Sequence, residues 1–329
     1  MNTELLQRVE TVYGLSEIVQ AIPVEKGVLS ANWVLHTGDS KLFLKRYRFE
    51  DESRIREIHA AKHFFADAGI PIILPKSTLD GKTYMAHEGR WFALFPFIAE
   101  RELERQNLSD TAVASMGSML ARIHKAGATS TVPIEKNFNY WDSKSFSSKA
   151  EALLAHIEAV EFRTEFDEMA LRDLYEKLEL AQANTVVHTD FVLPPDHLLH
   201  GDYLNHNLFF SEQYSVSHVF DLEKCLYGPR AYELVRSFLY SIADGDWNNE
   251  IARRIRIYIK AYRDVYAISN KEIANGLELY YVKSLHNVWI QHEHYVLGNT
   301  RPDQFLAPDM ARTAHLSIHR QDVLSEILN

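Results

Sequence analysis

The stretch Leu198-Leu-His-Gly-Asp-Tyr-Leu-Asn-His-Asn-Leu-Phe-Phe210 decides the fold of this chain. Apolar residues at its start and end enclose a polar centre, a pattern that predicts a strand, a loop and a second strand. The loop is therefore anchored in the core at both ends. A further apolar run, His218-Val-Phe-Asp-Leu-Glu223, carries one more carboxylate out of the same region.

The spacing His-x-Asp-x-x-x-x-Asn, from His200 to Asn207, is the catalytic-loop arrangement used for phosphoryl transfer. In that chemistry an aspartate accepts the proton of the acceptor hydroxyl, while an amide oxygen and a second carboxylate hold magnesium. Asp202 is therefore the expected base, and Asn207 and Asp221 are the expected Mg²⁺ ligands. Aspartate and asparagine also form ordinary turns, but four such residues in register favour the catalytic interpretation.

Gly201 follows His200, and Leu222-Glu223 follow Asp221, where a protein kinase has Arg and Phe-Gly. In these positions the chain resembles the aminoglycoside phosphotransferase and choline kinase branch of the protein kinase-like superfamily. Homoserine kinase type II and methylthioribose kinase are similar at this level. The resemblance implies a bilobal α+β fold. A small antiparallel β-sheet lobe over residues 1–97 would bind the nucleotide, and a mostly helical lobe over residues 98–329 would carry the catalytic loop and the acceptor site.

The same resemblance implies an ATP- and Mg²⁺-dependent phosphotransferase that acts on a hydroxyl of a small molecule. The acceptor classes are an aminoglycoside, an amino alcohol such as choline or homoserine, or a sugar. The alternative is a catalytically weak binding protein on the same scaffold, such as a pseudokinase or a spore-coat-like protein.

The first part of the chain predicts a helix over 3–13 and a three-stranded antiparallel meander over 18–44. Between two of these strands lies a loop with Gly27, Ser30 and Asn32. A glycine lets the backbone approach phosphate closely, and in the family this loop covers the nucleotide. An ordinary hairpin explains the same residues.

Lys45 shares a face of the third predicted strand with Phe43. The family places there the lysine that holds the α and β phosphates. We expect Glu57, near the start of a helix over 53–68, to pair with Lys45, and Glu52 is the second choice. Both glutamates also suit a helix N-terminus for electrostatic reasons.

Two more strands are expected over 78–84 and 90–97, which makes a five-stranded sheet. Phe95 and Phe97 then belong to the hinge between the lobes. In the family the hinge backbone hydrogen-bonds adenine, so an apolar slot matters more than side-chain identity.

Helices dominate after residue 110, with a polar loop expected at 143–148 and one long helix over 271–295. His124 is interpreted as a packed core histidine. Glu233 is interpreted as a structural anchor for the catalytic loop, because a carboxylate occurs there in the family.

The acceptor is expected to carry a positively charged amine. Carboxylates attract a cation and aromatic faces hold one, and the region after Asp221 is rich in both. The residues concerned are Glu223, Glu233, Asp244, Asp246, Glu293, Trp247, Trp289 and Tyr295.

Composition limits the partners and the location. The net charge of −10 does not favour nucleic-acid binding. Cys225 is the single cysteine, so no disulfide can form within the chain and a reducing cytoplasm is expected. No apolar run reaches membrane-spanning length, so no membrane association is expected.

Overall fold

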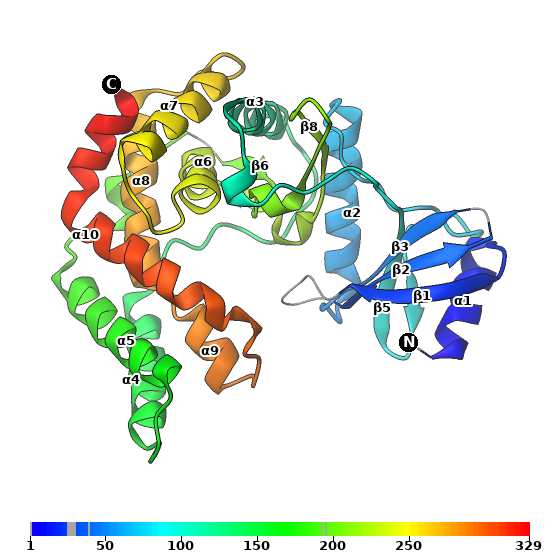
Figure 1. Cartoon of the computed structure of the whole chain (residues 1–329), viewed down its shortest axis with the longest axis horizontal. Helices are drawn as coiled ribbons and strands as arrows, with labels where there is room; N and C mark the ends of the chain where they lie inside the picture. The colour runs from blue at the N-terminus through cyan, green and yellow to red at the C-terminus, as the bar shows by residue number, and fades with distance from the viewer. Residues whose placement is uncertain (1, 25–30, 39, 192, 195) are drawn as a thin grey trace.

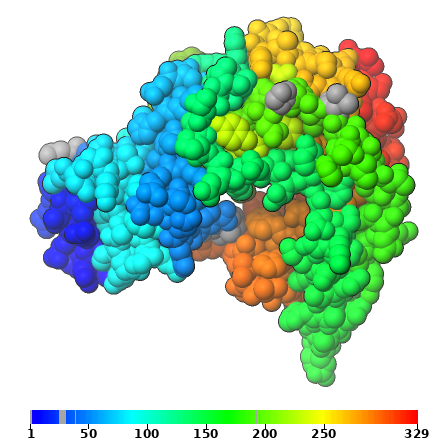
Figure 2. Space-filling model, turned by 180° about the vertical axis from the view of Figure 1, so that it is seen from behind, coloured from blue at the N-terminus to red at the C-terminus, as the bar shows by residue number. Residues whose placement is uncertain are grey.

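The computed structural model describes residues 2–24, 31–38, 40–191, 193–194 and 196–329. A five-stranded sheet with one helix lies at one end of the molecule, and most helices lie at the other (Figure 1). The bilobal α+β architecture expected from the sequence is confirmed. In the opposite view a hollow opens between the sheet-bearing lobe and the orange segment that includes α9 (Figure 2).

The sheet has the strand order β1-β2-β3-β5-β4, and every neighbouring pair is antiparallel. Helix α1 covers one face with Leu5, Val9 and Tyr13, which pack against Leu35 and Leu44. The sheet elements are α1 (Thr3–Tyr13), β1 (Ile18–Val24), β2 (Ala31–Thr37), β3 (Lys41–Arg46), β4 (Met85–His87) and β5 (Arg90–Pro96).

Helix α2 (Glu52–Asp67) lies between the sheet and the helical lobe (Figure 1). Asp51 caps its first turn by accepting the Ser53 N–H, and the buried Ile55 packs in the core cluster that holds Phe95 of the sheet. Just after the helix, the backbone joins β8, because Ile73 N–H donates to the Val219 carbonyl at 3.1 Å.

The helical lobe is built around a large apolar core that α3, α6, α7 and α8 share. Its helices are α3 (Asp110–Gly127), α4 (Ser143–Glu158), α5 (Glu165–Ala183), α6 (Arg230–Phe238), α7 (Asn249–Arg263), α8 (Asn270–Leu285), α9 (Trp289–Tyr295) and α10 (Leu306–Leu328). Four short strands carry the loops of interest: β6 (His197–Leu199), β7 (Leu208–Phe210), β8 (Val216–Val219) and β9 (Leu226–Gly228). Strand β6 pairs with β9, and β7 pairs with β8.

Three expectations from the sequence are wrong. Residues 143–148 form the start of α4, because Asp142 caps the helix and Phe146 is buried. Residues 78–84 contain a turn closed by Thr78, which bonds Asp80 and Lys82, and the strand comes after it as β4.

The third concerns the predicted helix over 271–295, which ends at Leu285 and restarts at Trp289. The Asn287 side chain accepts the Trp289 N–H at 3.1 Å, and such local bonds compete with the helix. In the described part of the chain, no helix is long and apolar enough to cross a membrane.

Candidate active site

The catalytic loop passes tightly against the loop that follows Asp221. Strands β6 and β7 anchor its two ends, as the apolar runs predict. Gly201 has a φ of +85°, and a Cβ at this position would overlap the Lys224 carbonyl oxygen. Only glycine allows this approach.

Glu233 of α6 supports the start of the loop. Its buried carboxylate accepts the backbone N–H groups of His200 at 3.2 Å and Gly201 at 2.5 Å. It also pairs with His124 Nε2 at 3.0 Å, and His124 is fully buried. The geometry matches the anchoring role expected for Glu233 and the core position expected for His124.

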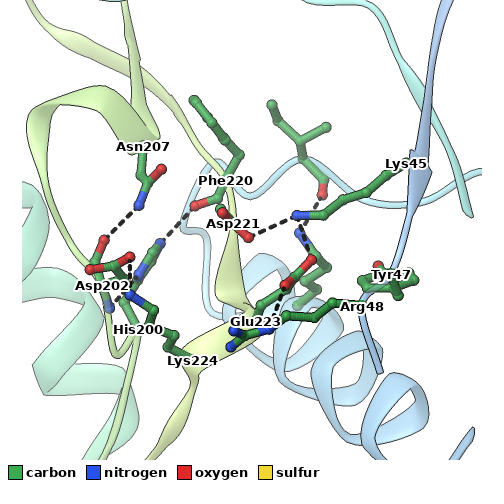
Figure 3. Close-up of polar contacts among 12 residues, drawn as sticks. Lys45, Tyr47, Arg48, His200, Asp202, Asn207, Phe220, Asp221, Glu223 and Lys224 are labelled. Atoms are coloured by element: carbon green, nitrogen blue, oxygen red, sulfur yellow. Dashed lines mark hydrogen bonds and ion pairs between the residues drawn. The ribbon is translucent and has the colours of Figure 1, made fainter. Parts of the chain in front are cut away.

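The His200 ring links the loop of Asp202 to the strand end that carries Asp221 (Figure 3). Its Nε2–H donates to the Phe220 carbonyl at 2.8 Å, so Nδ1 is left to accept the Asp202 N–H at 3.2 Å. Burial lowers the pKa of His200, which favours the neutral ring that both bonds require.

Asp202 lies between two cations. Lys224 Nζ is 2.9 Å from Oδ2, and Arg236 Nη2 is 2.6 Å from Oδ1. Burial alone would raise the pKa of Asp202, but the two cations outweigh burial and hold the pKa well below its ordinary range. Oδ1 is buried and receives no well-directed hydrogen bond from the described residues. The two cations therefore favour the ionised form of the expected base, and each of its oxygens lies against one of them.

Asn207 and Asp221 present oxygen atoms suited to magnesium. Asn207 Nδ2 donates to the Asp202 carbonyl at 2.8 Å, which leaves the amide oxygen at the other end of the group (Figure 3). Asp221 has a φ of +61°, a left-handed backbone that costs a non-glycine residue roughly 1–2 kcal/mol. Such strain is typical of functional sites. An amide oxygen and a carboxylate are hard ligands that fit Mg²⁺ when phosphate oxygens complete the shell.

Lys45 pairs with two carboxylates, at 2.8 Å from Asp221 Oδ1 and 2.8 Å from Glu223 Oε1. Burial would lower the pKa of Lys45, but these carboxylates outweigh it and raise the pKa. The ammonium is therefore charged at neutral pH.

The expected pair between Lys45 and Glu57 is not formed. Glu57 instead binds Arg54 at 2.7 Å and accepts the Glu135 N–H at 3.0 Å. Glu52, the second choice, accepts the Tyr84 hydroxyl.

The contacts of Arg54 show what the Glu57 carboxylate does in place of binding Lys45. Its Nη2 donates to the carbonyl oxygens of Glu223 at 2.9 Å and Cys225 at 2.7 Å. Glu57 thus orients an arginine that supports the loop after Asp221, and it acts on Lys45 only indirectly.

Asn32 lies directly opposite Lys45, on the neighbouring strand β2. Its Oδ1 is buried and has no hydrogen-bond partner in the described part of the chain. A buried polar atom without a partner is costly, and a ligand or water commonly satisfies it. Gly27 and Ser30, the other predicted residues of this loop, lie outside the described residues.

Apolar side chains gather beside the hinge. Phe95 is buried and packs against α2, whereas Phe97 is 38% exposed, with Lys41 Nζ 5.7 Å from the centre of its ring. Phe209 and Phe220, with ring centroids 4.8 Å apart, pack against the same core cluster as Phe95. Both lobes thus contribute aromatic side chains to this cluster.

Each of the carboxylates expected to attract a cationic acceptor already has a partner in the described part of the chain. Glu223 pairs with Lys45, Glu233 with His124, Asp244 and Asp246 with Arg105, and Glu293 with Asn299. The aromatic residues are also dispersed: Trp247 stacks on His315, Trp289 stacks on Phe305, and Tyr295 donates to Asp167.

Residues 20–268 match the model of the phosphotransferase enzyme family. The chain belongs to this family. A homoserine kinase of Methylobacillus glycogenes is 26% identical over 122 residues, which are 37% of this chain and 38% of that protein. Stress response kinase A of Salmonella choleraesuis is 29% identical over 117 residues, 33% of this chain and 35% of that protein. The chain thus matches little more than a third of either relative.

Solved structures share the fold over nearly the whole chain. An amicoumacin kinase in complex with AMP-PNP, Ca²⁺ and its ligand has a TM-score of 0.64 at 13% identity, and the match covers 98% of this chain and 93% of that one. A microcompartment-associated aminopropanol kinase has a TM-score of 0.63 at 16% identity, over 100% and 99% of the two chains. At these identities the likeness shows the fold alone.

Sequence reasoning missed three residues of the site in this family member and gave a fourth another role. Glu223 was expected near the acceptor, whereas its carboxylate pairs with Lys45. Arg236 had a signal, because it follows Glu233 by three residues and therefore shares its helix face. Phe209 had one because it follows Asn207 by two residues, in the strand that anchors the loop. Lys224 had no signal, because its contact with Asp202 depends on how two loops meet.

Proposed function

We propose that this protein is an ATP- and magnesium-dependent phosphotransferase that phosphorylates a hydroxyl of a small molecule. One observation carries the proposal: the Asp202 carboxylate, held between Lys224 and Arg236, lies in the same site as Asn207, Asp221 and Lys45. A kinase needs a proton acceptor, metal ligands and a cation for phosphate in one place.

Each lobe has its own part in this proposal. Residues 1–97 form the nucleotide lobe, where the Lys45 ammonium and the Asn32 Nδ2–H group donate to phosphate oxygens and the backbone at Phe95 to Phe97 borders the adenine slot. Residues 98–329 form the acceptor lobe, which contributes Phe209 to the slot. Asn207 and Asp221 would hold Mg²⁺, which when bound neutralises charge on the phosphates.

Asp202 orients the acceptor and takes its proton. The acceptor hydroxyl donates a hydrogen bond to Oδ1, and its oxygen forms a bond to the γ-phosphorus while the bond from phosphorus to the bridging oxygen breaks. The hydroxyl proton passes to Asp202, and ADP leaves with the bridging oxygen. Because the transition state of phosphoryl transfer is loose, positioning by Asp202 contributes more than its basicity.

The acceptor belongs to the small hydroxylated molecules. Aminopropanol kinase and ethanolamine kinase, both named for amino alcohols, are among the structures of similar fold. A cationic amino alcohol is accordingly one candidate. Glu223, Glu233, Asp244, Asp246 and Glu293 give this candidate no support, since each already has a partner.

A transfer assay tests the proposal. The full chain is incubated with ATP carrying a labelled γ-phosphate and with a panel of amino alcohols, hydroxy acids, aminoglycosides and sugars. We expect magnesium-dependent labelling of at least one acceptor, lost in Asp221→Ala. Nucleotide binding without transfer to any acceptor would favour the pseudokinase alternative and contradict the proposal.

A further inference from the structure

Arg236 has unused binding capacity at the catalytic centre. It lies on α6, its side chain is 17% exposed, and its single ion pair among the described residues is with Asp202 Oδ1 at 2.6 Å. The guanidinium lies 4.9 Å from the centre of the Tyr240 ring, which fixes its plane. Its bond to Asp202 uses few of the five N–H donors that a guanidinium carries.

Arg312, which stacks on the same Tyr240 ring at 3.8 Å, behaves differently. It donates to Asp309 at 3.0 Å and to the Tyr280 hydroxyl at 2.8 Å, and it is almost fully buried. Arg312 is therefore a structural arginine. Arg236 stacks on the same ring but is more exposed, at 17% against 4% for Arg312, and Asp202 is its one ion-pair partner among the described residues.

The charge around the base is positive. Asp202 is the one carboxylate within ion-pair distance of either Lys224 or Arg236 in the described part of the chain. Two cations thus share one negative charge where the acceptor must bring its hydroxyl. An acceptor with an ammonium group beside that hydroxyl would meet like charge, whereas an anionic group would balance it.

We propose that the acceptor carries a carboxylate close to its hydroxyl and that Arg236 binds this carboxylate. The inference rests on the proposed function, because it names the class of acceptor for the same site. A planar guanidinium matches a carboxylate through two parallel hydrogen bonds. Arg236 can bind it with N–H groups that do not face Asp202, so Nη2 stays beside Oδ1 and Asp202 keeps both cations.

The geometry limits the size of the acceptor. Arg236 Nη2 and Asp202 Oδ1 are 2.6 Å apart, and one hydrogen bond of about 3 Å extends from each. The hydroxyl oxygen and the carboxylate oxygen then lie within about 9 Å of each other. A short hydroxy acid or hydroxy amino acid meets this condition.

The competing explanation is that Arg236 only positions Asp202. In that case Arg236→Gln would slow the phosphorylation of every acceptor by the same factor. If Arg236 binds the acceptor carboxylate, the same substitution raises KM selectively for acids. The two explanations therefore differ in the ratio of activities toward matched acceptors.

The test uses pairs that differ only in charge: 4-hydroxybutyrate and 4-hydroxybutanamide, and homoserine and homoserine amide, with ethanolamine and choline as cationic alcohols. In the wild-type chain we expect kcat/KM for each acid to exceed that of its amide by roughly 10- to 100-fold, the usual value of hydrogen bonds to a charged group. Arg236→Gln should abolish this preference, and Arg236→Lys should restore part of it. Lys260→Gln removes a highly exposed cation of α7 and should keep the full preference.

Three results would overturn the inference. The first is an amide or a cationic alcohol that reacts as well as the acids, and the second is a preference for acids that survives in Arg236→Gln. If no acceptor is phosphorylated at all, the proposed function fails, and binding then decides this inference separately. Calorimetry with 4-hydroxybutyrate and its amide, in the presence of magnesium and AMP-PNP, should show binding of the acid that depends on Arg236. The third contradicting result is equal or absent binding of the two.

Discussion

Lys45 Nζ lies 2.8 Å from Asp221 Oδ1, so the lysine expected to bind phosphate and the carboxylate expected to bind metal neutralise each other. The pair joins β3 of the sheet to the end of β8 in the helical lobe. The phosphates of a bound nucleotide are negative and can bind Lys45, and its metal ion is positive and can bind Asp221. The nucleotide and metal can therefore replace this ion pair without leaving either charge unpaired.

Lys45→Met should weaken binding of magnesium ATP by roughly 10- to 100-fold, because hydrogen bonds from a charged donor are lost. The matched control is Arg46→Gln, which removes an exposed cation from the next position of the same strand. Calorimetry on both variants checks the prediction. Equal affinities of the two variants would contradict a phosphate-binding role for Lys45.

Asp221 stores backbone strain that a glycine would relieve. Asp221→Gly and Asp221→Ala remove the same ion pair with Lys45, but only alanine keeps a Cβ at a φ of +61°. We expect the glycine variant to be more stable by about 1 kcal/mol, while both lose metal-dependent nucleotide binding. Urea unfolding measures the difference, and a more stable alanine variant would rule out the strain.

Gly201→Ala should disrupt the catalytic loop, because its Cβ would overlap the Lys224 carbonyl oxygen. Gly81→Ala is the matched control, since Gly81 has a similar φ of +82° and nothing lies within 4 Å of the added Cβ. The control should lose only about 1 kcal/mol, and Gly201→Ala should lose more and be inactive. Similar melting temperatures and activities for the two variants would argue against close contact between the loops.

Lys62 makes stability depend on pH. Burial lowers its pKa to about 8, and Lys45 adds to the effect, whereas its ordinary value is 10.5. Between pH 8 and 10.5 the unfolded chain binds more protons at this site than the folded chain, so the stability of the folded protein rises with pH. Lys62→Met should therefore be more stable than the wild type at pH 7, and the gap should shrink by about 3 kcal/mol as the pH rises to 10.5. Chemical unfolding of both proteins across this range checks the sign, and a gap that widens would contradict it.

The sequence predicts those parts of the site that depend on local spacing. The order of strand, loop and strand around Asp202 follows from alternating apolar and polar runs, and the structure brings Asp202, Asn207 and Asp221 together as that order requires. The anchoring role of Glu233 was also anticipated, because the resemblance to the family places a carboxylate at this position. The five-stranded sheet was predicted, although β4 begins later than expected because Thr78 closes a turn.

Contacts between distant segments could not be predicted in the same way. Glu57 was expected to pair with Lys45. It pairs instead with Arg54, whose guanidinium also donates to the backbone carbonyl of Glu223. The ion pairs of Asp202 depend on the positions that the fold gives to Lys224 and Arg236, and sequence spacing does not reveal these positions. Side-chain charge alone does not say which of several carboxylates a buried cation will reach, since burial and geometry decide the pairing.

The most direct test of the central claim is the rate of phosphoryl transfer in Asp202→Asn, measured in a single turnover at saturating magnesium ATP with an acceptor found in the screen. Loss of a positioned base should slow transfer by roughly 10²- to 10⁴-fold, while the affinity for the nucleotide stays nearly unchanged and thermal unfolding shows a folded protein. Transfer at close to the wild-type rate would contradict the assignment of Asp202 as the residue that takes the acceptor proton.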